Sequence, residues 1–271
     1  ELDLSDYEKL DNWFREKTPE VVILAAAKVG GILANNNNPA DFILENLRIQ
    51  TNIIEISQKY KVKKFLFLGS SCIYPKFAQQ PINEESLLDG KLEKTNQFYA
   101  IAKIAGIKLC EALTIQKGFN AISLMPTNLY GPNDNFSELD SHVIPGLISR
   151  MHKAKKENTL SFKIWGSGQP LREFMHVDDL ASSILFIIEK NINDDLINIG
   201  SGYEISIINL AKKIKTIVGY EGDLIFDSSK PDGNPRKLLD SELINSLGWK
   251  AKIDLDTGLA STYEWYSQNL N

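Results

Sequence analysis

The sequence predicts an α/β protein with a doubly wound, mostly parallel sheet and a smaller C-terminal substrate lobe. Three short apolar segments, 21–26, 65–69 and 121–126, show no regular polar alternation, which is typical of strands buried on both faces of a parallel sheet. Segments of helical length separate them, as in a series of βαβ units. Small and polar residues follow the strands, and ligands of open α/β sheets bind at that edge.

Composition disfavours several classes of protein. The 271 residues, 43% hydrophobic and 24% charged, suffice for one globular unit or two small lobes with a sizeable core. The net charge of −5 and the lack of a long basic tract disfavour nucleic-acid binding. No apolar run reaches the roughly 18 to 20 residues of a membrane span, and no signal peptide is recognisable. Cys72 and Cys110 lack metal-ligand spacing, so we expect no metal site and a reducing, cytoplasmic environment.

The N-terminal part predicts helices on either side of the first strand. Ser5 or Asp6 is suited to cap a helix that runs to about Glu16. Segment 39–60 is apolar around much of its girth over helical length, so it packs against the sheet or against a partner helix. Lys28 lies in a loop of small residues that lets the backbone approach a ligand, and it is a candidate contact for a substrate or a phosphate.

The C-terminal half alternates turn-rich loops with short elements. We expect segment 162–176 to form a strand pair around its Gly-rich turn. Asp178 or Asp179 is suited to cap the helix that follows. Further expected elements are a helix after His142, a strand at 196–201, a helix at 204–218, a short strand at 224–226 and a closing helix at 256–270.

The clearest indication of chemistry lies after the second strand. Strand 65–69 ends in Ser-Ser-Cys at 70–72, which we expect to face a cleft. Tyr99 and Lys103 stand four residues apart, so they share one face of a predicted helix. A lysine ammonium beside a phenol lowers the pKa of the phenol, which makes a tyrosine usable for proton transfer near neutral pH. A serine hydroxyl opposite the tyrosine can hold a substrate oxygen.

The motifs Gly-Ser-Ser at 69–71 and Tyr-Ala-Ile-Ala-Lys at 99–103 together resemble the extended short-chain dehydrogenase/reductase family. Longer stretches narrow the resemblance to the members that act on GDP-sugars, namely LGSSCIYPK, YAIAKIAGIKLCE, MPTNLYGPNDNF, SHVIP and PDGNPRKLLD. The resemblance covers the chain from its first residues to its C-terminus. It implies a Rossmann-like sheet, NADP(H) as cofactor, and 3,5-epimerisation and 4-keto reduction of GDP-4-keto-6-deoxy-D-mannose to GDP-L-fucose.

The resemblance also implies roles for the residues that match the family motifs. The implied catalytic residues are Ser70, Cys72, Tyr99, Lys103 and His142. The implied cofactor contacts are Leu68, Gly69, Ser70, Ser71, Lys103, Pro126, Thr127, Asn128, Leu129 and His142. The implied substrate contacts are Asn128, Arg150, Trp165, Arg172, Asp232 and Lys237. His152 matches no motif, and we expect it at the surface.

Further expectations concern organisation and assembly. We expect a cofactor-binding domain in 1–161 and a mainly substrate-binding lobe in 162–271, with some segments returning to the sheet. The family pairs the helices that correspond to 39–60 and 98–117 across a two-fold axis, which implies a homodimer. Its first βα unit, whose G-x-x-G-x-x-G turn binds the cofactor pyrophosphate, has no counterpart in the sequence. We therefore expect weak cofactor binding from these residues alone.

The implied mechanism divides the work between two sets of side chains. Epimerisation needs an acid and a base, and Cys72 and His142 suit these roles because thiol and imidazole pKa values bracket neutrality. Either residue can be the base. Ser70 and Tyr99 would stabilise the enolate oxygen. In the reduction Tyr99 would donate the proton to the C4 oxygen, while Lys103 holds the nicotinamide ribose.

Two other kinds of function stay open. A sugar-nucleotide 4-epimerase or 4,6-dehydratase would use the same scaffold. Dehydratases of the family place a Thr-Asp-Glu set where this chain has Ser-Ser-Cys at 70–72, and a 4-epimerase needs no acid/base pair beyond serine and tyrosine. A non-catalytic binding module without the phosphate turn is the third hypothesis, and the presence of Ser70, Tyr99 and Lys103 argues against it.

Overall fold

The computed structural model describes residues 2–138, 141–229 and 232–270. The chain divides into two compact units. The first contains the chain up to Ala78, Glu84–Pro126 and Ile184–Ile199, and the second contains Gln79–Asn83, Thr127–Ser183 and the chain from Gly200. The division after Pro126 precedes the expected boundary at 161/162, and segment 184–199 belongs to the first unit although it follows Thr127–Ser183 of the second.

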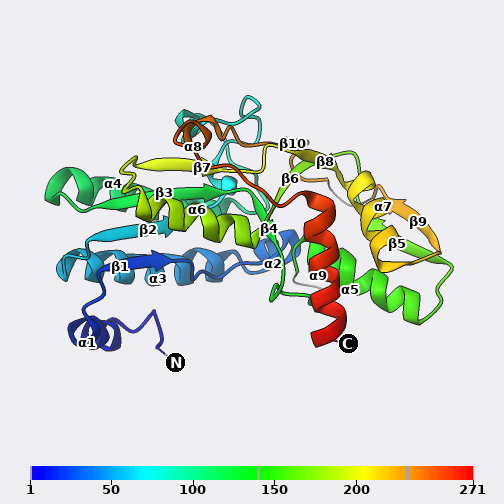
Figure 1. Ribbon diagram of the computed structural model, residues 1–271, viewed down its shortest axis with the longest axis horizontal. Helices are drawn as coiled ribbons and strands as arrows, with labels where there is room; N and C mark the ends of the chain where they lie inside the picture. The colour runs from blue at the N-terminus through cyan, green and yellow to red at the C-terminus, as the bar shows by residue number, and fades with distance from the viewer. Residues whose placement is uncertain (1, 139–140, 230–231, 271) are drawn as a thin grey trace. The chain divides into compact units, whose positions relative to one another are not determined.

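The first unit is a parallel sheet with helices. Its elements are α1 (Tyr7–Lys17), β1 (Val21–Leu24), α2 (Ile32–Asn37), α3 (Pro39–Lys59), β2 (Lys64–Leu68), the 3₁₀ turns η1 (Ser71–Ile73) and η2 (Glu84–Ser86), α4 (Gln97–Lys117), β3 (Ala121–Pro126), the C-terminal half of α6 (Val177–Glu189) and β7 (Leu196–Ile199). Its four strands lie side by side in the order β1-β2-β3-β7, all parallel (Figure 1). The predicted parallel α/β sheet is confirmed.

Local signals explain where the helices of this unit begin and how closely they pack. The Asp6 carboxylate accepts a hydrogen bond from the Lys9 backbone N–H at 3.1 Å, which caps α1 as predicted. In α4, a Cβ on Gly106 would lie only 2.5 Å from the Phe67 ring. Glycine is therefore required for α4 to lie so close to β2. The Gln50 amide of α3 donates to the Ala102 carbonyl of α4 at 2.5 Å, which fixes the two helices together.

The second unit contains two small sheets and a helical layer. Its elements are β4 (Asn128–Tyr130), α5 (Val143–Lys156), β5 (Ser161–Trp165), β6 (Leu171–His176), the N-terminal half of α6, β8 (Glu204–Ser206), α7 (Ile207–Val218), β9 (Asp223–Asp227), β10 (Arg236–Lys237), α8 (Glu242–Ser246) and α9 (Leu255–Asn269). One sheet has the order β10-β6-β4 with β8 antiparallel to β6, and the other pairs β5 with β9 in parallel. Helices α5, α7 and α9 enclose its apolar core, which includes Met151, Leu210 and Leu259.

The expectation that two strands within 162–176 pair with each other is wrong. Both strands exist, but β5 pairs with β9 and β6 lies between β10 and β4. The linker bonds to other segments: the Gly166 N–H donates to the Asp227 carbonyl, and the Gly168 carbonyl accepts from Ile208. With Gly166 and Gly168 at φ +84° and +75°, the turn directs the chain away from a hairpin.

Two smaller expectations also differ from the structure. Segment 204–218 begins with strand β8 before helix α7, because β8 pairs with β6. Asp178 and Asp179 lie within the first turn of α6 and not at its N-cap. The buried Asp179 carboxylate accepts hydrogen bonds from the backbone N–H groups of Lys252 and Ile253 at 3.1 and 2.9 Å, so it fixes a distant segment.

Candidate active site

The carboxyl end of β2 forms the first part of the candidate site. Ser70 is the N-cap of η1, and its hydroxyl accepts a hydrogen bond from the Cys72 backbone N–H at 3.3 Å. Ser70 and Cys72 are partly exposed, whereas Ser71 is buried. The Gly69 backbone N–H continues the ladder to Leu124 at 2.9 Å, so the strand geometry extends to the residue before Ser70. The side chains of Ser70 and Cys72 are thus accessible, whereas Ser71, which was also expected to face a cleft, is buried.

Helix α4 brings Tyr99 to the same turn. The Tyr99 ring meets Phe42 edge to face at 6.4 Å, and its hydroxyl is hydrogen-bonded to Ser70. Burial and the neighbouring Cys72 raise the pKa of Tyr99, and the Ser70 hydrogen bond opposes the rise. The structure therefore brings Ser70, Cys72 and Tyr99 together within the first unit.

Lys103 does not bring the pKa of Tyr99 below its ordinary value, contrary to the expectation. Its ammonium donates to the Leu68 carbonyl at 2.8 Å and lies 4.8 Å from the Phe67 ring centroid and 5.9 Å from that of Tyr99. Only 3% of the Lys103 surface is exposed, and this burial lowers the pKa of Lys103 to about 8. Burial removes water from both groups and favours the neutral form of each, so the pKa of Tyr99 rises while that of Lys103 falls.

Asn96 is a residue of this site that the sequence reasoning missed. It is the N-cap of α4, and its amide donates to the Cys72 sulfur at 3.2 Å. A hydrogen bond to sulfur favours the thiolate, so Asn96 is suited to support Cys72 as an acid or base. The only sequence signal was an asparagine in front of a helix, a position more often explained by capping.

Pro126 ends β3 in the first unit, and the second unit holds the other cofactor candidates. The Asn128 amide and the Thr127 hydroxyl both donate to the Glu173 carbonyl, at 2.7 and 3.1 Å. Leu129 follows in β4. His142 is exposed at the N-cap of α5, and its side chain makes no capping hydrogen bond. The helix after His142 is as predicted.

Three of the substrate candidates gather around β6 and β10. Arg172 pairs with Lys237 in the parallel ladder, and its guanidinium donates to the Asp232 carbonyl at 3.4 Å. The Asp232 carboxylate accepts from both the backbone and the hydroxyl of Ser167, at 2.7 Å each. Trp165 ends β5 with 52% of its surface exposed, which leaves indole surface available for stacking. Ser167 was missed from the sequence.

Other candidates have local explanations. Arg150 donates to the Gly146 carbonyl at 3.0 Å and stacks its guanidinium 5.2 Å from the Phe162 ring. Lys28 forms ion pairs with Glu45 at 2.5 Å and Asp41 at 3.8 Å, so acidic neighbours already compensate its charge. His152 was expected at the surface but is buried, with Nδ1 3.0 Å from the Tyr263 hydroxyl.

The described residues fit the nicotinamide-ribose end of a dinucleotide. Tyr99 and Lys103 supply hydrogen-bond donors near the end of β2, and the buried Asn96 Oδ1 has no hydrogen-bond partner among the described residues. These groups match ribose hydroxyls and a carboxamide. Within the described ranges, no group of three or more His, Cys, Asp or Glu side chains is placed to hold a metal ion. None of the described helices has the length and apolar character to cross a membrane.

A parallel βαβ sheet that places a serine, a tyrosine and a lysine at the end of one strand defines a nicotinamide-dependent reductase or epimerase. The chain belongs to the NAD dependent epimerase/dehydratase family, whose model matches residues 1–200.

Individual relatives are similar over almost the whole chain. A probable GDP-L-fucose synthase of Oryza sativa subsp. japonica is 56% identical over 271 residues, which are all of this chain and 83% of the relative. The GDP-L-fucose synthase of Escherichia coli (strain K12) is 51% identical and aligns with 99% of this chain and 87% of its own. The solved structure of a GDP-mannoheptose C4 reductase from Campylobacter jejuni with NADP bound matches with a TM-score of 0.89 and 40% identity, over 98% of this chain and 87% of the other.

Proposed function

We propose that this protein carries out the NADPH-dependent 3,5-epimerisation and 4-keto reduction of GDP-4-keto-6-deoxy-D-mannose to GDP-L-fucose. The convergence of Ser70, Cys72 and Tyr99 at the end of β2 is the observation that carries the proposal, because it combines reductase groups with a thiol. A plain reductase needs no thiol there. The identity of 56% to a probable GDP-L-fucose synthase over the full length supports the choice of substrate.

The epimerisation uses the acidity of carbons beside a ketone. Loss of a proton from C3 or C5 gives an enolate at the C4 oxygen, and the hydroxyls of Ser70 and Tyr99 donate hydrogen bonds to that oxygen. We assign the acid and base roles to Cys72 and His142. The Asn96 amide, 3.2 Å from the Cys72 sulfur, stabilises the thiolate when Cys72 acts as the base.

The reduction uses Tyr99 as the proton donor. Because burial raises its pKa, Tyr99 keeps its proton at neutral pH and can transfer it to the C4 oxygen. NADPH, when bound, supplies the hydride. Lys103 holds ribose hydroxyls and carries a positive charge that offsets the phenolate formed at Tyr99.

The GDP-sugar contacts that we propose lie in the second unit. Arg172 and Lys237 are adjacent cations on paired strands, suited to a diphosphate. Trp165 offers a stacking surface for the base or the sugar, and the Asp232 carboxylate is a hydrogen-bond acceptor. The Asn128 amide, which donates to the Glu173 carbonyl, is a further proposed contact. Arg150 is a further candidate for the diphosphate.

Two properties of the whole protein belong to the same proposal. We propose a homodimer through α3 and α4, because both helices expose large apolar side chains, including Leu44, Phe98, Ile101 and Ile115. We also propose a cytoplasmic location, which suits the two free cysteines, Cys72 and Cys110.

Turnover in deuterated water tests the proposed reaction. The full-length protein, given the keto sugar and NADPH, is expected to form GDP-L-fucose with deuterium at both C3 and C5, detected by mass spectrometry and NMR. Reduced product without label would identify a plain C4 reductase, and isomerised product without NADPH consumption would identify an epimerase. Either result would show that the proposed function is wrong.

Two variants and a matched control assign the roles. Cys72→Ala is expected to abolish label incorporation while leaving NADP⁺ affinity unchanged. Tyr99→Phe is expected to slow reduction about 10²-fold or more, the contribution typical of a general acid, with some exchange surviving. Cys110→Ala removes the other, buried thiol and should retain both activities. Loss of exchange in Cys110→Ala but not in Cys72→Ala would contradict the assignment.

A further inference from the structure

Glu173 is a fully buried carboxylate that the proposed mechanism does not use. It lies on β6 directly after Arg172, and none of its surface is exposed. Its Oε1 accepts from the Gly202 backbone N–H at 2.8 Å and its Oε2 from the Leu239 backbone N–H at 3.1 Å. Burial of a carboxylate is costly unless hydrogen bonds satisfy it, so these two bonds make the position possible.

The carboxylate joins three segments of the second unit. They are β6 itself, the turn at 200–202 and the segment after β10. The turn lies so close that a Cβ on Gly200 would stand 2.9 Å from Glu173 Cδ. The Glu173 main chain adds a fourth segment, because its carbonyl accepts the Asn128 amide. Glu173 thus anchors the segments that carry three substrate candidates, Asn128, Arg172 and Lys237.

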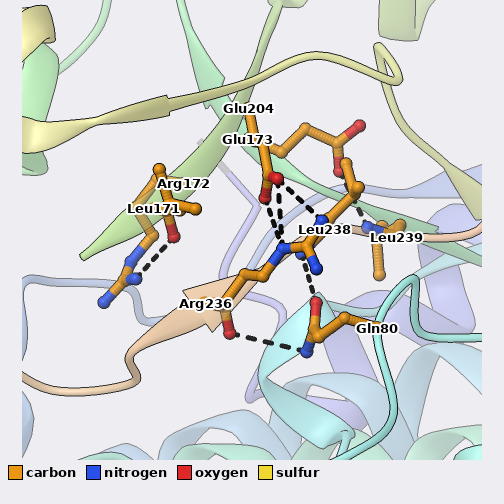
Figure 2. Close-up of polar contacts among 8 residues, drawn as sticks. All are labelled: Gln80, Leu171, Arg172, Glu173, Glu204, Arg236, Leu238 and Leu239. Carbon is orange, nitrogen blue, oxygen red and sulfur yellow. Dashed lines mark hydrogen bonds and ion pairs between the residues drawn. The ribbon is translucent and has the colours of Figure 1, made fainter.

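The segment 236–239 is anchored at several successive positions. Figure 2 shows the Arg236 guanidinium against the Glu204 carboxylate and the Gln80 amide beside the same segment. Gln80 Oε1 accepts from the Leu238 N–H at 2.9 Å, and Glu173 accepts from the next residue, Leu239. Among these anchors, Glu173 is the one that lies wholly inside the unit.

We propose that Glu173 is a positioning residue for nucleotide-sugar binding, whose carboxylate sets the spacing of Arg172 and Lys237. Lys237 stands two residues before Leu239 and opposite Arg172 in the ladder. A shift of Leu239 away from β6 therefore moves the Lys237 ammonium relative to the Arg172 guanidinium. Because none of its surface is exposed, Glu173 acts through its neighbours and not on the ligand. The inference rests on the proposed function, because it assumes that these residues hold the GDP moiety.

Glu173→Gln tests the inference, because an amide has one acceptor oxygen and one NH₂ group. The amide oxygen can accept a hydrogen bond from the backbone N–H of either Gly202 or Leu239. The NH₂ group then faces the other N–H, which loses its acceptor. Dissociation constants for GDP and for NADP⁺ would be measured by calorimetry on the full-length protein. We expect Glu173→Gln to weaken GDP binding at least tenfold and to leave NADP⁺ binding within twofold of wild type. Glu173→Asp keeps two acceptors and should recover part of the lost affinity.

Asp179→Asn is the matched control. Asp179 is likewise buried and accepts two backbone N–H groups, from Lys252 and Ile253, but it holds no substrate candidate. The Asp179→Asn variant should have a lowered melting temperature, much as Glu173→Gln does, but its GDP affinity should stay within twofold of wild type. A purely structural role for Glu173 would give the two variants the same GDP affinity.

The outcomes separate the two proposals. If wild type binds GDP and Glu173→Gln binds it equally well, the positioning role is wrong and the proposed function stands. If wild type binds no GDP, the proposed function is wrong, and the positioning role is refuted with it. Should Glu173→Gln not fold, Glu173→Asp decides, since its shorter side chain is expected to weaken GDP binding at least threefold. Unchanged affinity would overturn the inference.

Discussion

Hydration of single side chains governs the protonation of Tyr99 and Lys103. Burial raises the pKa of Tyr99 and lowers the pKa of Lys103 to about 8, so at neutral pH both still carry their protons. This is the state that the reduction requires, with a neutral acid beside a cation. Keeping Lys103 charged while it is 3% exposed is unfavourable for folding.

We expect Lys103→Met to stabilise the fold and to abolish reduction. The depressed pKa corresponds to about 3 kcal/mol of destabilisation by the buried charge. Loss of the hydrogen bond to Leu68 offsets about 1 kcal/mol, so the net gain at pH 7 is about 2 kcal/mol. Urea unfolding of both proteins would measure it.

The pH dependence gives this prediction a second check. Below about pH 8, Lys103 is protonated in both the folded and the unfolded state, so the buried charge destabilises the fold by its full amount. Between about pH 8 and the ordinary lysine pKa of 10.5, the unfolded chain binds more protons, and the stability of wild type rises relative to the variant. A stability difference that stays constant from pH 7 to pH 10 would contradict the assignment.

The site residues that the sequence could and could not predict differ in the range of their contacts. Tyr99 and Lys103 were recognisable because four residues on one helix place them on one face. Asn96 contacts Cys72 24 residues away, Ser167 contacts Asp232 65 residues away, and Glu173 contacts Leu239 66 residues away. No local pattern encodes such pairs, so these roles needed the fold.

Secondary-structure elements show the same dependence on range. Helices α1, α3 and α9 were predicted to within about a residue at each end, because caps, Pro39 and apolar periodicity are local signals. The expected pair of β5 and β6 was wrong, because a Gly-rich turn between two apolar runs resembles a hairpin. The actual partner of β5 is β9, about 60 residues later in the chain, and that choice depends on tertiary packing.

The exposed faces of α3 and α4 lead to a prediction about assembly. We expect Ile101→Asp to convert the proposed dimer into a folded monomer, because Ile101 is 43% exposed within one chain and is not one of its buried core residues. Analytical ultracentrifugation would measure the mass. Leu160→Asp is the control, since Leu160 is 89% exposed outside these helices. A wild-type monomer at micromolar concentration, or a dimeric Ile101→Asp, would show that the proposed interface is wrong.

At the scale of the whole molecule, the proposed roles divide between the two units. The first unit holds most of the cofactor candidates, including Leu68, Ser70 and Lys103, and the second holds the GDP-sugar contacts proposed above. Each set depends on hydrogen bonds within its own unit, such as those from Lys103 to Leu68 and from Leu239 to Glu173. Ligand effects on local stability should therefore report on one unit at a time.

Hydrogen exchange with each ligand tests this division. A ligand that binds the folded state suppresses local opening near its contacts and slows exchange there. We expect NADP⁺ to slow exchange chiefly in 68–72, and GDP to slow it chiefly in 171–173 and 236–239. Leu239 is the most informative amide, because it bonds to Glu173, so its protection by GDP should be lost in Glu173→Gln and retained in Asp179→Asn. Protection of 68–72 by GDP, with none in 236–239, would move the nucleotide to the first unit and contradict both the division and the positioning role.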